Sequence, residues 1–257
     1  MLLENKNAVV YGAGGNVGGS VARAFAREGA KVFLTGRTRA PLEVVAGEIV
    51  DSGGLAEVAQ VDALDREQVE AHAATMAAAG GIDVSFNAVW IRGDLQGKPL
   101  LEMGLDDFTT PITVAATTCF VTSTAVARHM VERGSGVIPM LSTSAARLSG
   151  RDERFHTTGG FGVACGAIET FTRVLAGEVG PRGVRVLCLR SEALPETWGL
   201  DGPVEETPHG RFMTDGTVLG RMPTLRELGD TAAFLASDRA SALTRTVVNV
   251  SAGSVLD

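Results

Sequence analysis

Three glycines at intervals of three residues follow the first apolar run of the chain. Residues 7–11 (NAVVY) form that run, Gly12, Gly15 and Gly18 come next, and apolar residues at helical spacing then continue as far as Gly29. A buried strand, a glycine loop and a helix in this order are typical of the βαβ unit that holds a pyrophosphate. Glycine lets the phosphates approach the backbone, and the helix N-terminus offers free N–H groups. The plainer alternative is a tight strand-to-helix turn that binds nothing.

The same succession of a short β-branched run and a helical pattern recurs along the chain. Strands are expected at residues 7–11, 31–35, 56–61, 83–89, 137–141, 184–189 and 246–250, with long helices at 107–132 and 162–179. Strands that alternate with helices predict an α/β fold, namely a Rossmann-type doubly wound parallel sheet of about seven strands with helices on both faces. Because no linker or repeat interrupts the pattern, residues 1–257 are expected to form a single domain. The irregular segment 192–222 is expected to be a flap on the substrate side.

Composition restricts the classes of partner. The chain of 257 residues has a formal net charge of −7 and no basic cluster, which argues against nucleic acid. Its three cysteines are widely spaced, so neither a disulfide framework nor a zinc site is expected. No apolar run has the length of a membrane span, and a strand beginning at Asn7 leaves no room for a signal peptide. We therefore expect a cytoplasmic chain with no metal, no membrane contact and a small-molecule substrate.

The end of the second expected strand bears on the choice of cofactor. It reads Thr35-Gly-Arg-Thr-Arg39 and contains no acidic residue that would bind a ribose 2′-hydroxyl. Arg37 and Arg39 offer guanidinium groups to a 2′-phosphate instead. NADP(H) is therefore favoured over NAD(H), although Arg39 is equally well explained as a solvated residue.

The chain resembles the short-chain dehydrogenase/reductase family over almost its whole length. Residues 11–18 lie over the family's Thr-Gly-x-x-x-Gly-x-Gly loop, with Asn16 in place of the middle glycine. Val61-Asp-Ala, Ile82-Asp83 followed by Asn87-Ala88, residues 176–186, and Val250-Ser-Ala-Gly253 match further signatures. The resemblance implies a homodimer or homotetramer built on the two long helices. It also implies a nicotinamide nucleotide held by Gly12, Gly15, Asn16, Val17, Gly18, Arg37, Asp62, Ala63, Asn87 and Ala88.

The catalytic residues that the resemblance implies are missing. Family members use a Tyr with a Lys four residues later, and the Lys lowers the pKa of the phenol so that it exchanges a proton with substrate. Aligned from Gly180-Pro181, this chain has Phe161 at the Tyr position, Cys165 at the Lys position, Ala115 at the Asn position and Thr143 at the Ser position; Ser191-Glu192 replaces the family's Pro-Gly. Another register cannot restore the pair, because the only Tyr is Tyr11 and no Lys follows Lys98.

Candidate proton donors are Thr143, Ser144 and His156. His156 lies between the fifth strand and the following helix, where substrate would approach, but a solvent-facing loop residue is the plainer explanation. Arg147, Arg151 and Arg154 either bind an anionic substrate or are simply solvated. Cys165 is expected to be a small buried residue in the space of the former Lys.

Three functions fit these observations. The first is an NADP-dependent oxidoreductase that transfers hydride to or from a carbonyl compound or an activated alkene, whose enolate takes its proton from solvent. The second is a catalytically inactive nucleotide-binding protein, acting as a sensor or partner subunit, and the third is a non-redox lyase or isomerase. We favour the first by analogy, because the family is mostly enzymatic.

Overall fold

The computed structural model describes residues 1–148, 156–199 and 204–255. Within them, seven parallel strands form one sheet in the order β3-β2-β1-β4-β5-β6-β7. The chain runs outward from β1 to β3, returns to β4 beside β1 and runs outward again, so the sheet is doubly wound as predicted. The strands are β1 (Asn7–Tyr11), β2 (Lys31–Gly36), β3 (Leu55–Gln60), β4 (Val84–Asn87), β5 (Gly136–Thr143), β6 (Val184–Ser191) and β7 (Val247–Val250).

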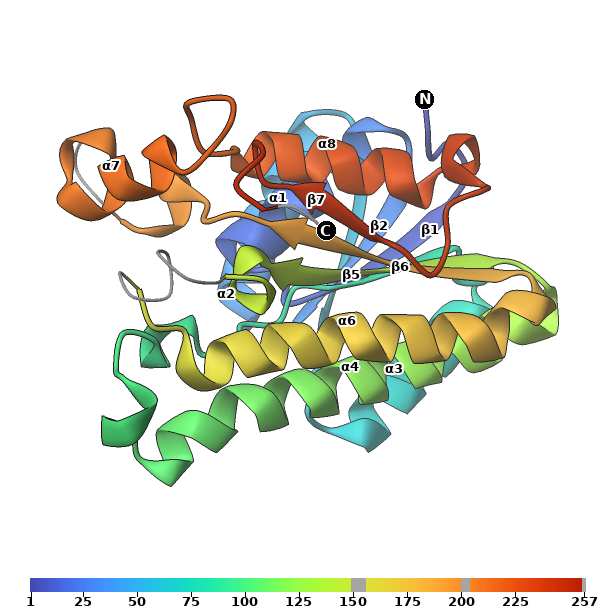
Figure 1. Cartoon of the computed structure of the whole chain (residues 1–257). Coiled ribbons are helices and arrows are strands. Elements are labelled where there is room, and N and C mark those ends of the chain that lie inside the picture. The colour runs from blue at the N-terminus through green and yellow to red at the C-terminus, as the bar shows by residue number, and fades with distance from the viewer. Residues whose placement is uncertain (149–155, 200–203, 256–257) are drawn as a thin grey trace.

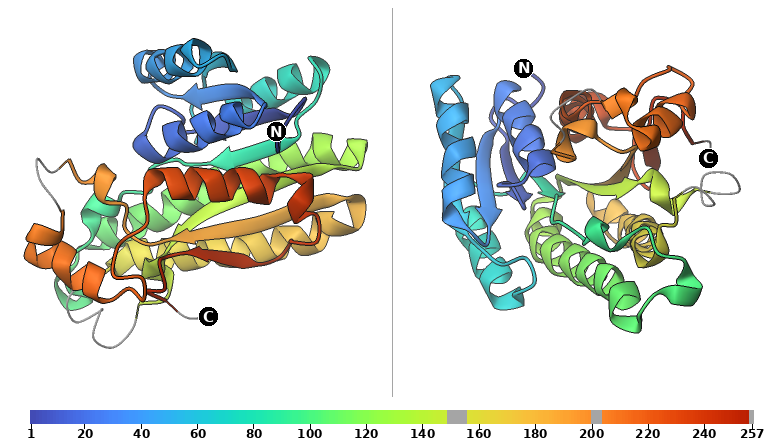
Figure 2. Two further views of the ribbon diagram at one scale, coloured as in Figure 1. Left: turned by 90° about the horizontal axis from the view of Figure 1, so that it is seen from above. Right: turned by 90° about the vertical axis from the view of Figure 1, so that its left-hand side faces the viewer.

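Helices cover both faces of the sheet (Figure 1). One face carries α1 (Asn16–Arg27), α2 (Arg39–Asp51) and α8 (Leu225–Ala236), and the other carries α3 (Arg66–Ala78), α4 (Leu105–Arg133) and α6 (Gly159–Val179). Figure 2 shows the same three layers from two further sides. Each outer layer has its own apolar cluster, and the neighbours Val9 and Val10 of β1 belong to opposite clusters. Successive side chains of a strand point to opposite faces of the sheet, so this alternation shows that β1 is buried on both faces.

The predicted strands and long helices are confirmed, with ends that differ by a few residues. β5 and β6 continue beyond their predicted ends to Thr143 and Ser191, which are partners in the sheet. β4 ends at Asn87 rather than at residue 89, because the Asn87 side chain accepts a hydrogen bond from the backbone N–H of Val89 and turns the chain. Because β5 and β6 are longer than predicted, the residues that follow them, Ser144 and Glu192, lie further toward the carboxyl edge of the sheet.

The segment 192–222 has more regular structure than its composition predicts. Pro195–Thr197 forms a short 3-10 helix, and α7 spans Pro208–Asp215. Thr207 caps α7 by accepting a hydrogen bond from the backbone N–H of Gly210. Residues 200–203 lie outside the described part of the chain. That the segment moves as a flap stays a prediction.

The apolar helix α4 is a core element. By length and composition alone it could cross a membrane, but 56% of its most apolar window is buried inside the fold. Ala115, Cys119 and Val126 are among its buried residues, and they belong to the apolar cluster on that face of the sheet. Burial of this kind is typical of a core helix in a globular domain.

A buried ion pair joins α6 to β6 near the carboxyl end of the sheet. The Arg190 guanidinium donates from Nε to Oε1 of Glu169 at 2.7 Å and from Nη2 to Oε2 at 2.8 Å. Arg190 is fully buried, and Glu169 is 3% exposed. Ser142 of β5 also donates to Glu169 at 3.0 Å, and Arg190 donates to Asn249 of β7 at 2.9 Å. The pair therefore connects one helix to three adjacent strands.

Replacing Arg190 with Met tests what this ion pair contributes. Because Arg190→Met leaves the Glu169 carboxylate buried without its guanidinium, we expect the free energy of unfolding to fall by about 3–5 kcal/mol. Arg182→Met, which removes an exposed guanidinium, should change it by less than about 0.5 kcal/mol. Urea unfolding followed by circular dichroism measures both variants. Equal unfolding midpoints would show that the pair contributes little.

Candidate active site

A cavity of about 520 Å³ lies at the carboxyl ends of β1, β4, β5 and β6. Its walls come from the glycine loop, the segments that follow β4, β5 and β6, the first turns of α6, and α7. β1 and β4 are the neighbouring strands at which the strand order reverses. Ligands of doubly wound sheets bind in the crevice at this point.

The glycine loop is held in place by the backbone of the chain itself. Gly12 has a φ of +78°, and a Cβ built on it would lie 2.7 Å from the carbonyl oxygen of Ala88. A Cβ on Gly18 would overlap the carbonyl oxygen of Gly12. Both glycines are therefore required for the loop to pack, before any ligand is considered. This packing requirement is additional to the reason given from the sequence, the approach of a pyrophosphate, which stays a prediction.

The N-terminus of α1 opens into the cavity beside this loop. Gly15 is the N-cap residue and forms no side-chain capping hydrogen bond. Asn16, Val17 and Gly18 line the cavity together with Gly15. The first N–H groups of a helix have no partner within it, and they lie at the positive end of the helix dipole. These residues fit the pyrophosphate of a dinucleotide.

Asn87 and Ala88 bring the end of β4 into the same cavity. The Asn87 side chain is already engaged, because its Oδ1 accepts from the N–H of Val89 at 3.0 Å and its Nδ2 donates to Thr118 Oγ1 at 3.3 Å. Asn87 therefore fixes the turn after β4. Ala88 contributes the backbone against which Gly12 packs.

The residues expected at the adenosine half lie outside the cavity walls. Arg37 is exposed and forms no ion pair with the described residues, whereas Arg39 binds Glu43 at 2.7 Å. Asp62 accepts a hydrogen bond from the backbone N–H of Leu64 at 3.0 Å, and Ala63 beside it is buried. Of the two arginines, Arg37 thus keeps its guanidinium available to a phosphate.

Phe161 and Cys165 line the cavity from the first turns of α6, four residues apart on one face. Cys165 is fully buried, with its Sγ 3.4 Å from Thr143 Oγ1, and burial raises the pKa of its thiol. Ala115 is buried on α4 and is not a wall residue. At these positions the chain has a hydrocarbon ring, a neutral thiol and a methyl group. None of them is an effective acid at neutral pH.

The amino end of α6 is held against the backbone of α4. A Cβ on Gly160 would overlap the carbonyl oxygen of Phe108. The two helices therefore meet backbone to backbone at the residue that precedes Phe161. This contact places the Phe161 ring in the cavity wall.

The single tyrosine of the chain lies elsewhere. Tyr11 is fully buried in β1, and burial raises the pKa of its phenol. Its hydroxyl has no hydrogen-bond partner within the described ranges. A phenol enclosed in the core cannot replace the tyrosine missing from α6.

The three candidate proton donors, Thr143, Ser144 and His156, all line the cavity. Ser144 donates its hydroxyl proton to Glu192 at 2.8 Å. His156 is half-buried, with Nε2 3.2 Å from Oε1 of Gln96, so it does not face solvent freely. Burial and, to a smaller degree, the neighbouring His209 lower the pKa of His156. It is therefore a neutral imidazole at neutral pH, which is a weak acid.

Of the three arginines considered for an anionic substrate, only Arg147 lies within the described residues. Arg147 is exposed after the 3-10 helix Ser144–Ala146. Arg151 and Arg154 lie outside the described residues. An anion-binding role for the three arginines stays a prediction.

A buried carboxyl group that was not assigned to the site from the sequence enters the cavity after β6. Glu192 is 4% exposed and is a wall residue. Its Oε1 accepts hydrogen bonds from Ser144 Oγ at 2.8 Å and from the N–H of Ala193 at 3.0 Å, and its Oε2 accepts from Ser254 Oγ. The sequence feature that could have pointed to Glu192 is an acidic residue at the end of β6, where the resemblance to the family implies a glycine.

Aromatic rings gather at the same cavity. The His209 ring lies 5.2 Å from His156 and 5.3 Å from Trp198, measured between ring centroids, and Trp90 lines the cavity as well. Trp198 and His209 were missed because the segment after β6 carries no recognisable motif. Burial lowers the pKa of His209 as it does that of His156.

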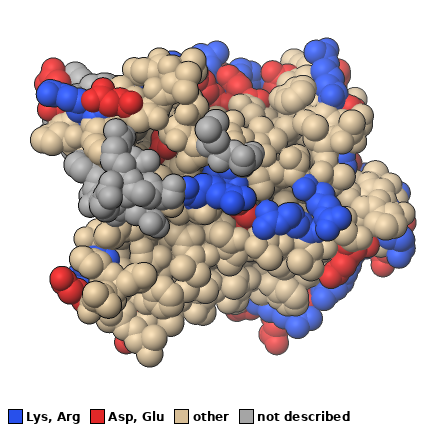
Figure 3. All heavy atoms as spheres, in the orientation of Figure 1, with Lys and Arg blue, Asp and Glu red and all other residues tan. Residues whose placement is uncertain are grey.

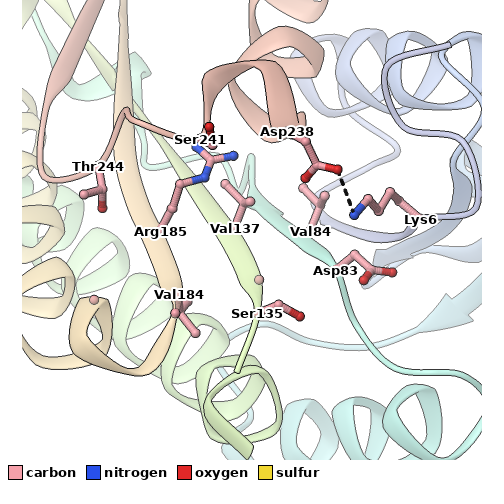
Figure 4. A pocket seen from close by; sticks show the side chains of 14 residues that line it. Lys6, Asp83, Val84, Ser135, Val137, Val184, Arg185, Asp238, Ser241 and Thr244 are labelled. Carbon is pink, nitrogen blue, oxygen red and sulfur yellow. Dashed lines mark ion pairs between the residues drawn. The ribbon is translucent and has the colours of Figure 1, made fainter. Parts of the chain in front are cut away.

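A second cavity, of about 420 Å³, lies at the opposite, amino-terminal edge of the sheet (Figure 4). Its charged side chains are engaged in the fold: Lys6 pairs with Asp238 at 3.5 Å, and Asp83 with Arg133 at 2.9 Å. The Arg185 guanidinium donates to the carbonyl oxygens of Leu235, Ser237 and Leu243. These contacts favour a structural role for this cavity.

Comparison with known proteins agrees with the fold and the glycine loop. A family profile described as enoyl-(acyl carrier protein) reductase matches residues 12–254. The short-chain reductase protein NovJ of Streptomyces niveus is 32% identical over 96% of this chain and 92% of that protein. The uncharacterized oxidoreductase YxbG of Bacillus subtilis (strain 168) is 30% identical over 98% of this chain and 91% of that protein.

Solved structures extend the agreement to three dimensions. A crystal structure from Beutenbergia cavernae, of an NAD(P)-dependent gluconate 5-dehydrogenase with NADP bound at low occupancy, is 31% identical and has a TM-score of 0.85. The match covers 98% of this chain and 97% of that one. Because sequence and fold agree over nearly the whole length, the chain belongs to the short-chain dehydrogenase/reductase family of oxidoreductases.

Proposed function

We propose that the protein is an NADP(H)-dependent oxidoreductase acting on a small substrate whose reduction needs no acid from the protein. The observation that carries this proposal is the cavity itself. It joins an uncapped helix N-terminus at one end to Phe161 and Cys165 at the other. A nicotinamide nucleotide bound there would supply the hydride.

The preference for NADP(H) rests on Arg37. Its exposed guanidinium follows β2, where a ribose 2′-substituent lies in folds of this kind, and no carboxylate of the described chain is paired with it. The structural relative from Beutenbergia cavernae binds NADP, which agrees with this preference.

The substrate must tolerate the loss of the positioned acid. Reduction of a simple ketone needs a proton on oxygen as hydride reaches carbon, and a positioned acid typically contributes about 10²–10⁴-fold to such a step. Phe161 and neutral Cys165 cannot supply it. A polarised double bond does not require a protein acid if the product of hydride addition takes its proton from solvent. The same holds if the substrate is already protonated before hydride reaches it. An activated alkene is one such substrate.

A titration and a screen distinguish this function from its alternatives. Fluorescence titration with NADPH tests nucleotide binding, and oxidation of NADPH in the presence of carbonyl compounds, enones and imines tests hydride transfer. Binding without any turnover would favour a nucleotide-dependent sensor or partner subunit. Conversion of a substrate without net oxidation of NADPH would favour a lyase or isomerase.

Exchanging Arg37 for Asp tests the choice of cofactor. Arg37→Asp removes a charge-assisted contact to the 2′-phosphate and adds repulsion, so NADPH binding should weaken by about 1–3 kcal/mol, with little change for NADH. Arg39→Asp is the matched control and should have a smaller effect, because Arg39 is paired with Glu43. Equal affinities of the unmutated protein for NADH and NADPH would contradict the assignment.

Restoring the missing pair tests the placement of the active site. Phe161→Tyr alone should give little ketone reductase activity, because its phenol keeps a pKa near 10. Adding Cys165→Lys lowers that pKa, so the double variant should show a weak gain, larger than the sum of the single variants, measured as ketone-dependent oxidation of NADPH. Strong ketone reduction by the unmutated protein, unaffected by substitution of Thr143, Ser144 and His156, would show that the site is misplaced.

The proposed assembly is a homodimer or homotetramer through α4 and α6. Phe120 and Val163 are each 49% exposed and Val174 is 54% exposed, and Figure 3 shows few charged side chains over this part of the surface. An apolar face of this kind suits a contact between copies of the chain.

Light scattering tests the assembly at micromolar concentration. The unmutated protein should have the mass of a dimer or tetramer, and Phe120→Glu should reduce it because burying an unpaired carboxylate in an interface is unfavourable. Val44→Glu, at an exposed position of α2, is the control and should leave the mass unchanged. A monomeric mass for the unmutated protein would contradict the proposal.

A further inference from the structure

Glu192 places a negative charge inside the cavity without a cationic partner among the described residues. Its carboxylate is 4% exposed and accepts three hydrogen bonds, from Ser144, Ser254 and the N–H of Ala193. These donors orient both oxygens, but none of them carries a positive charge. A carboxylate that is buried in this way is costly unless a cation comes to it.

The rest of the wall, over the residues that the structure describes, does not supply that cation. The described wall residues include no Lys and no Arg, and the Lys expected from the family is Cys165. The other acidic wall residue, Asp94, is paired with Arg92 at 2.8 Å, so its charge is already balanced. Among the described residues, the charge at this end of the cavity is therefore that of Glu192, where the family resemblance implies a lysine.

Glu192 lies close to Thr143 and Ser144, two of the candidate proton donors. Ser191 is the sheet partner of Thr143, so Glu192 follows directly on the pair that joins β6 to β5. Thr143 contacts Cys165 at 3.4 Å, and Ser144 contacts Glu192 at 2.8 Å. The pairing of β5 with β6 thus connects the Glu192 carboxylate to the face of α6 that carries Phe161 and Cys165.

The aromatic rings around the cavity suit a cationic ligand as well. Trp90 and Trp198 line it together with His156 and His209, and the faces of the two indole rings attract cations. Burial lowers the pKa of both histidines, so neither ring adds a positive charge at neutral pH that would repel such a ligand.

From this juxtaposition we propose that the substrate is a cationic C=N compound, a protonated imine or iminium ion on an apolar or aryl framework. The proposal rests on the proposed function and specifies its substrate class. Reduction of a ketone or an enone instead places negative charge on oxygen, and Glu192 would oppose that charge in the same cavity.

The hydride step balances without any acid from the protein. With a reduced nicotinamide nucleotide bound, a C–H bond of its ring would break as a C–H bond forms at the imine carbon, and the π pair of the C=N bond would move onto nitrogen. The nitrogen keeps the substituents or proton it already has, so a neutral amine is released. The reductant is the reduced nicotinamide nucleotide, which is oxidised by two electrons. The single positive charge passes from substrate to cofactor within the cavity, and the Glu192 carboxylate faces one positive charge before and after.

Binding of a permanent cation tests the proposal apart from turnover. The probe is the N-methyl dihydroisoquinolinium ion, and its neutral counterpart is the methyl-substituted dihydronaphthalene of the same shape. Both Trp residues of the chain line the cavity, so tryptophan fluorescence reports its occupancy, and calorimetry checks the affinity. Titrations use the protein alone and the protein saturated with tetrahydro-NADP, which has a neutral ring and transfers no hydride. We expect the cation to bind at least about tenfold more tightly than its neutral counterpart.

Three variants show whether Glu192 is responsible. Glu192→Gln should weaken binding of the cation by about tenfold or more and leave the neutral compound unchanged. Cys165→Lys adds a positive charge without altering Glu192 and should also reject the cation selectively, which keeps the test valid if Glu192→Gln does not fold. Glu178→Gln, on the exposed side of α6, is the control and should change neither affinity.

The outcomes separate this inference from the proposed function. Equal binding of cation and neutral compound by the unmutated protein, or binding unaffected by both Glu192→Gln and Cys165→Lys, would overturn the inference. Turnover of enones or ketones with NADPH but not of the iminium probe would also overturn it and leave the proposed function standing. Glu192-dependent binding of the cation without turnover of any acceptor would support the cation site and overturn the proposed function.

Discussion

Glu169 and Arg190 are buried together between α6 and the sheet, and the rest of the site depends on that contact. Removing two charges from water is costly, and the two-point geometry at 2.7 and 2.8 Å offsets the cost. The single hydroxyl proton of Ser142 is within reach of both Glu169 Oε1 at 3.0 Å and the carbonyl oxygen of Cys165 at 3.2 Å, so the ion pair is also connected to the second turn of α6. Phe161 and Cys165 therefore occupy fixed positions relative to the ends of β5 and β6.

The resemblance to the family implies two replacements on neighbouring elements that change the electrostatics of the site. They are a buried thiol, Cys165, at the position of a lysine and a buried carboxyl group, Glu192, at the position of a glycine. Together they suit a reaction that begins with positive charge on the substrate and needs no proton transfer in the hydride step.

Much of this molecule could be predicted from local patterns. The order of strands and helices and the glycine loop follow from periodicity and turn chemistry. The role given to Arg37, from its place after the second strand, stays a prediction. Glu192 could not be assigned to the site, because its role depends on Ser144 and Ser254, which are distant in sequence and meet it only in the folded chain. The same is true of Trp198 and His209, which lie in a segment without a motif. The structure adds a second reason for the loop glycines, the contact between Gly12 and Ala88, which is not visible in the sequence.

The contact at Gly160 fixes the amino end of α6 against α4 through backbone atoms. Because α6 meets α4 through backbone atoms there, this contact does not depend on which side chain follows Gly160. A substitution at position 161 therefore changes the packing and the chemistry of the cavity wall, but it leaves in place the backbone contact that holds the amino end of α6.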